Sequence, residues 1–136
     1  GDVYKRQLLQ YLAMKTELRT VDSKPMNAAL TLRNAELTAT QLQQPLYKAS
    51  LLLLICEQLV GTQLHRAKTI HAQIDIQSIE VIEAPSARRV VAKWWEVKSM
   101  FDDQERVMSL REAILRYRSV GCPNRARMLS SRLHSV

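Results

Sequence analysis

Two cysteines and three histidines are the side chains best suited to bind a metal or act as nucleophiles, but their spacing supports neither role. Cys56 lies in the most apolar stretch and Cys122 lies near the end, so no Cys-x-x-Cys or zinc-finger spacing is present. His65 and His71 are six residues apart, about 120° around a helix, so they do not share a face. We therefore expect no metal site, no disulfide, a buried Cys56 and a hydrogen-bonded His71.

The carboxylate pairs that could act in general acid–base catalysis are more simply explained as residues of a solvated loop and of a helix cap. Glu80 and Glu83 precede a predicted loop, and Asp102 with Glu105 has the spacing of a weak capping box at a helix start. The chain carries no Gly-x-Ser-x-Gly, phosphate-loop, dinucleotide or His-Glu-x-x-His motif. We expect a protein that is not an enzyme and that uses no cofactor.

Arginine dominates the C-terminal part of the chain. From residue 111 onward, six arginines accompany a single acid, Glu112. Arg111 and Arg118 are seven residues apart and share one helical face, as do Arg125 and Arg132. Such a face is suited to a nucleic acid, an anionic lipid or an acidic protein. Because no nucleic-acid motif is present and few aromatic side chains are near to stack on bases, we favour a solvated face or an acidic protein partner.

Two adjacent tryptophans form the other candidate surface. Neighbouring residues on a helix point about 100° apart, so Trp94 is expected to face the core while Trp95 lies at its rim. Tryptophans at such rims often anchor protein interfaces, although both rings would equally suit the core. The candidate interface residues are Trp95, Arg111, Arg118, Arg125 and Arg132.

Length and composition limit the class of protein. The chain has 136 residues, of which 46% are apolar and 24% charged, and a net charge of +7. These values fit one globular domain or a piece of a larger one and exclude a disordered tail. The longest apolar run, Leu51–Cys56, is too short to cross a bilayer, and no secretory signal is visible. We expect an intracellular, cytoplasmic protein, with a lost N-terminal targeting signal left open.

The first seven residues are set apart from the fold. Asp2–Gln7 resembles the in-frame translation of a sequencing adapter, so we treat residues 1–7 as a non-native scar. A short native basic end is the alternative. Residues 8–136 are then a single helical domain, or a fragment of a larger helical protein, with a sub-boundary at the loop 83–86.

The helix-forming composition and the few glycines and prolines predict an all-α fold. We expect an antiparallel helical bundle or a short α-solenoid fragment of about six or seven helices. The expected helices span about 8–19, 25–42, 45–60 and 63–73, followed by one from Pro85 to a break near 102–103, one from there to Gly121, and one from Pro123. Asp22 or Ser23 is expected to cap the second helix, and Val136 to end the apolar stripe of the last.

Several positions are predicted to lie inside. The helix over 45–60 is apolar on every face and should be central, with Leu53 buried, while Ala67 permits two backbones to approach closely. The stretch 74–83 alternates β-branched residues as a strand would. A single strand has no partner in this chain, so we favour an irregular or helical continuation there.

The region 26–74 resembles a known helical domain. The resemblance is carried by Leu30, Leu32, Leu37, Leu42, Pro45, Leu51–Leu54 and the pattern Leu64-x2-Ala67-x2-Ile70-His71-x2-Ile74. It is similar to the domain shared by the C-terminus of the COPII outer-coat large subunit and the steroid receptor RNA activator protein. Leu64 stands where that family prefers an aromatic residue. The resemblance implies a non-enzymatic adaptor and assigns no functional residue.

The sequence thus predicts a non-enzymatic protein–protein interaction or scaffold module. Its partner is another protein, and an acidic one would suit the arginines. The alternative is a basic nucleic-acid-binding helical module that uses the arginine-rich C-terminal face.

Overall fold

The computed structural model describes residues 1–20 and 25–135, and over these residues the chain is all-α, as predicted, with eight helices and no strand. The helices are α1 (Asp2–Thr20), α2 (Pro25–Gln41), α3 (Pro45–Leu59), α4 (Leu64–Gln73), α5 (Ile76–Glu80), α6 (Pro85–Phe101), α7 (Arg106–Ser119) and α8 (Pro123–His134). The expected caps at Asp22 and Ser23, and the expected packing of Val136, lie outside the described residues.

Proline and glycine set the helix ends. Each of the four prolines is the first residue of a helix, where the missing N–H costs nothing because that group has no partner within a helix. After α7 the chain turns at Gly121, whose φ of 74° is in the left-handed region that favours glycine. The N–H of Cys122 then donates to the carbonyl oxygen of Tyr117 at 2.8 Å, which closes the end of the helix.

The stretch 74–83 contains α5, so its helical interpretation is confirmed and the strand alternative is wrong. Asp75 accepts a hydrogen bond from the N–H of Ser78 at 3.3 Å, and Ile79 is buried. Because α5 was not expected as a separate helix, the expected count of six or seven is too low. The predicted break near 102–103 is also present, and Asp102 accepts from the N–H of Glu105 at 3.2 Å.

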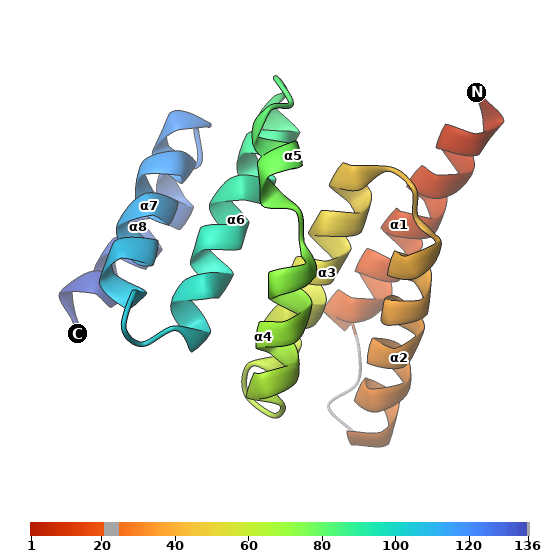
Figure 1. Ribbon diagram of the computed structural model, residues 1–136, viewed down its shortest axis with the longest axis horizontal. Helices are drawn as coiled ribbons and strands as arrows, with labels where there is room; N and C mark the ends of the chain where they lie inside the picture. The colour runs from red at the N-terminus through yellow and green to blue at the C-terminus, as the bar shows by residue number, and fades with distance from the viewer. Residues whose placement is uncertain (21–24, 136) are drawn as a thin grey trace.

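The helices succeed one another along a row from α1 and α2 at one end to α7 and α8 at the other (Figure 1). In this row α3 is central, as predicted, because it contacts α1, α2, α4, α5 and α6. The helices α1, α3 and α6 run in the same direction, from the top to the bottom of Figure 1. Whether this row is a bundle or part of a solenoid stays a prediction.

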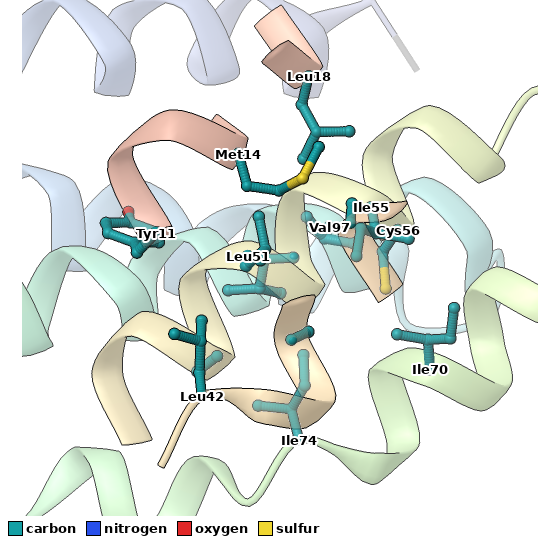
Figure 2. Close-up of a cluster of buried hydrophobic side chains, with 14 of the residues drawn as sticks. Tyr11, Met14, Leu18, Leu42, Leu51, Ile55, Cys56, Ile70, Ile74 and Val97 are labelled. Carbon is teal, nitrogen blue, oxygen red and sulfur yellow. The ribbon is translucent and has the colours of Figure 1, made fainter. Parts of the chain in front are cut away.

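Two apolar clusters form the core. The larger one surrounds α3, and Figure 2 shows side chains of α1, α3, α4 and α6 meeting in it, among them Leu18, Leu51, Ile70 and Val97. Leu53 and Ala67 are fully buried in it, as expected. The smaller cluster joins α6 to α7 and α8 around Leu110 and Leu129. Since α6 contributes to both clusters, it connects the two ends of the row.

Candidate cationic binding groove

A groove of about 380 Å³ lies over α3, between α1 and α6. The groove forms because α1 and α6 both pack on α3. Within the described residues, these two helices do not pack on each other. Its floor is formed by Leu46, Tyr47, Ser50, Leu53 and Leu54 of α3, and its walls by Tyr11, Lys15 and Arg19 of α1 and by Ser86, Arg89, Val90 and Lys93 of α6, with Tyr117 of α7 at the edge.

The aromatic side chains at one end of the groove are fixed by their contacts. The rings of Tyr11 and Tyr47 are stacked, with centroids 5.1 Å apart and planes 9° apart. The hydroxyl groups of Tyr11 and Ser50 share a hydrogen bond of 2.7 Å. These contacts join α1 to α3 and hold a flat aromatic wall beside the apolar floor, which is pre-organised for a ligand with an apolar side.

Four cationic side chains and no acidic one line the groove. Lys15 and Arg19 are four residues apart on α1, and Arg89 and Lys93 are four apart on α6, so each wall carries two cations on one helical face. Lys15 lies over the ring of Tyr11, with its Nζ 5.4 Å from the centroid. Lys93 pairs with Glu57 at 2.7 Å and has Glu96 at 3.6 Å, so its charge is largely compensated.

Three of these cations are not compensated by an acidic side chain. Among residues 1–20 and 25–135, none of Lys15, Arg19 and Arg89 has an ion-pair partner within 4.0 Å. They come from opposite walls, so the positive charge spans the groove. An anionic group between the walls would gain from the charges on both sides at once.

A buried network lies next to the groove and fixes α6 against α7 and α8. The carboxylate of Glu96, which is 0% exposed, accepts hydrogen bonds from Tyr117 Oη at 2.8 Å and Arg125 Nε at 2.9 Å, and a second guanidinium nitrogen of Arg125 bonds its other oxygen. Burial by itself raises the pKa of Glu96, but the Arg125 hydrogen bonds, the Lys93 charge and the Tyr117 hydrogen bond together lower it below its ordinary value. The ionised carboxylate is thus the stable form.

The predicted interface arginines have different surroundings. Arg111 and Arg118 are exposed on α7 and have no ion-pair partner among the described residues. Arg132 is half-buried on α8, and Arg125 uses its guanidinium group on Glu96. The structure therefore leaves Arg111 and Arg118 as the pair of this set most available to a partner.

Trp95 is half-buried and packs against both apolar clusters. Lys98 and Arg116 lie over its ring, 5.2 Å and 5.9 Å from the centroid, and its indole nitrogen is buried without a hydrogen-bond partner. These contacts come from α6 and α7 themselves. They make Trp95 a packing residue between the two helices.

The expected hydrogen-bonded histidine is confirmed. His71 is buried, donates from Nε2 to the carbonyl oxygen of Trp94 at 3.0 Å, and stacks on the Trp94 ring at 4.4 Å. Burial lowers its pKa, partly opposed by the bond to the carbonyl, so the neutral ring is favoured. This histidine ties α4 to α6 and is a structural residue.

Both cysteines are free thiols, and Cys56 is buried as predicted. Burial raises the pKa of Cys56 to about 12, so its thiol stays protonated, and it donates to the carbonyl oxygen of Ala67 at 3.5 Å. In the part of the chain that the structure describes, no three Cys, His, Asp or Glu side chains come together in a way that could hold a metal ion.

The groove escapes sequence reasoning because its walls are far apart along the chain. The only sequence signal is the repeated spacing of four between Lys15 and Arg19 and between Arg89 and Lys93. That spacing places each pair on one face of its helix. It does not reveal that the two helices lie on either side of α3.

The chain matches no protein-family model, and neither a curated protein nor a solved structure matches it significantly. The resemblance of residues 26–74 to a coat-protein and co-regulator domain therefore stays a prediction. No helix that the structure describes has the length and the apolar content needed to cross a membrane.

Proposed function

We propose that this protein is a non-enzymatic protein–protein interaction module that binds an acidic segment of a partner protein in the groove over α3. The observation that carries the proposal is the lining of the groove, which combines an apolar floor with four cations and no acid. Three of the cations, Lys15, Arg19 and Arg89, have no ion-pair partner among the described residues.

The combination of charge and apolar surface favours a polypeptide. Interfaces between proteins join an apolar centre to a polar or charged rim, and tyrosines are common at their centres. The half-buried Leu46, Tyr47 and Leu54 would provide that centre, and Lys15 and Arg89 the charged rim. Complementary charge at the rim speeds encounter and selects acidic partners.

A second candidate function is nucleic-acid binding through the exposed face of α7. The observation in its favour is that Arg111 and Arg118 are both exposed and unpaired within the described residues. Arg111 and Arg118 also provide a matched control for the groove. Reversing these two charges changes the net charge of the protein as much as reversing Lys15 and Arg89 does.

The test measures binding of two labelled polyanions at physiological salt by fluorescence anisotropy. The probes are poly-L-glutamate and poly-uridylate RNA. The proteins are the parent and two double variants: the groove variant, with Lys15→Glu and Arg89→Glu, and the α7 variant, with Arg111→Glu and Arg118→Glu. We expect the groove variant to lose affinity for poly-glutamate by about tenfold or more, and the α7 variant to lose much less.

The opposite pattern would refute the proposal. Equal losses in both variants would show attraction to the net charge alone. Tighter binding of the RNA that only the α7 variant abolishes would establish the nucleic-acid function instead. Far-UV circular dichroism and thermal melting confirm that each variant is folded, and the corresponding alanine pairs replace any variant that is not.

A further inference from the structure

We infer that the segment bound in the groove is an amphipathic α-helix whose apolar face lies on α3 and whose acidic residues flank that face on both sides. This inference rests on the proposed function and specifies the conformation and side-chain pattern of the ligand. A bound helix would continue the packing of α1 and α6 on α3, since it would contact all three helices.

The arrangement of α1, α3 and α6 suits a helical ligand. Both α1 and α6 pack on α3, yet within the described residues they do not pack on each other. All three run in the same direction (Figure 1). The lining of the groove follows these helices over 11–19, 46–54 and 86–93, so the groove runs along α3, as a groove for a helix does.

The residues on the floor of the groove have a helical period. The lining residues of α3 lie at positions 46, 47, 50, 53 and 54, which is one face of a helix over two turns and more. Most of them are apolar, and the space above them is about 380 Å³. Two helices pack by fitting the side-chain ridges of one into the grooves of the other, and the half-buried side chains at positions 46, 47, 50 and 54 offer such ridges above the buried Leu53.

The cations on the walls of the groove also have a helical spacing. Lys15 and Arg19 on one wall, and Arg89 and Lys93 on the other, are each spaced by four residues, about 6 Å along a helix axis. A ligand helix carries side chains at the same spacing on each side of its apolar stripe. Glutamates four apart on one side would meet Lys15 and Arg19. A glutamate on the other side would meet Arg89, since two acidic side chains already compensate Lys93.

An extended ligand fits the groove less well. Extended peptides that bind by adding to a sheet edge find no partner here, since the described residues offer no strand. Single-stranded nucleic acids need stacking surfaces along a charged track, whereas the aromatic pair Tyr11 and Tyr47 lies with its rings already stacked on each other.

The experiment is a display selection with a random library of peptides about 16 residues long, enough for four turns of helix. Three immobilised baits are used at physiological salt: the parent, Lys15→Glu with Arg89→Glu, and Arg111→Glu with Arg118→Glu. We expect peptides enriched on the parent to have apolar residues at a helical period with Asp or Glu beside them. The same peptides should be enriched on the α7 variant but not on the groove variant.

The best enriched peptide is then synthesised with and without a central proline. We expect its helical circular dichroism signal to increase on binding, and the central proline to weaken binding about tenfold or more because it breaks the helix. A proline at the first position should be tolerated.

The outcomes separate the two proposals. Enriched acidic peptides that have no helical period, or that tolerate the central proline, would overturn the helical ligand and leave the acidic-segment function standing. Enrichment without acidic residues, or equal enrichment on the groove variant, would overturn both. No enrichment on the parent would also overturn both.

Discussion

The guanidinium group of Arg125 on α8 holds the fully buried carboxylate of Glu96 on α6 through two of its nitrogens. Tyr117 of α7 donates to the same carboxylate at 2.8 Å, so one acidic side chain connects three helices. A buried ion pair contributes little net stability when intact, but the loss of one partner leaves a charge without compensation. This makes Arg125 a structural residue of the C-terminal end.

Arg125→Ala should therefore destabilise the protein far more than the same change at an exposed arginine. We expect a loss of about 3 kcal/mol, the lower end for a broken buried pair because Arg125 is 34% exposed and Lys93 remains 3.6 Å from Glu96. The control Arg111→Ala should change stability by less than about 0.5 kcal/mol. Urea denaturation followed by circular dichroism measures both, and equal effects would contradict the role assigned to Arg125.

Glu96 should also make stability depend on acid pH. Its pKa in the folded protein lies below the ordinary value of 4.5, because the hydrogen bonds and charges of Arg125 and Lys93 outweigh the effect of burial. The stability that the ionised carboxylate contributes is then complete above the unfolded pKa and is lost as the pH falls through the lower folded value. Glu96→Gln should be less stable at neutral pH and lose less stability on acidification, as denaturant titrations at several pH values would show. A parallel loss in both proteins would contradict this.

An interface role for Arg125 stays a prediction, but its contact with Glu96 is one that the sequence pattern did not predict. The spacing of Arg125 and Arg132 correctly places both on one helix. The partner of Arg125, Glu96, is 29 residues earlier in the chain. No sequence pattern around Glu96 marks it as the partner of this arginine. Long-range pairs of this kind depend on how α6, α7 and α8 pack, which no local pattern encodes.

Features that depend on neighbouring residues, in contrast, could be predicted from the sequence. The prolines at the helix starts, Gly121 at the end of α7 and the burial of the apolar α3 all follow from the chemistry of a few adjacent residues. The groove does not, because it arises where two helices on α3 fail to meet. The cations Lys15 and Arg89 on its two walls are more than seventy residues apart.

The N-terminal end offers a test of where the fold begins. The side chain of Gln7 is buried and accepts hydrogen bonds of 2.9 Å from the N–H groups of both Gln43 and Gln44, just before α3. Gln7→Ala should cost about 1–2 kcal/mol, as the loss of a helix cap does. Deleting only Gly1–Arg6, which are exposed, should leave the melting temperature nearly unchanged. A large drop on that deletion would show that Gly1–Arg6 also belong to the fold.

The contact between α3 and α4 can be tested at Ala67. This residue is 0% exposed, and its carbonyl oxygen accepts from Cys56 Sγ at 3.5 Å, so the two backbones approach closely there. Ala67→Glu adds volume and an unpaired charge and should cost several kcal/mol, roughly 3 or more. Ala72→Glu, at an exposed position of the same helix, is the matched control and should melt near the parent. Similar melting of both variants would show that the assigned contact is wrong.

The central claim is that acidic segments bind over α3, between α1 and α6. The most direct measurement is a titration of the ¹⁵N-labelled protein with a glutamate-rich peptide at physiological salt, followed by the amide chemical shifts. We predict that the largest shifts lie in the groove, at Lys15, Ser50 and Arg89, and that they disappear in the Lys15→Glu, Arg89→Glu variant. Shifts concentrated on α7 at Arg111 and Arg118, with the groove unaffected, would contradict the claim.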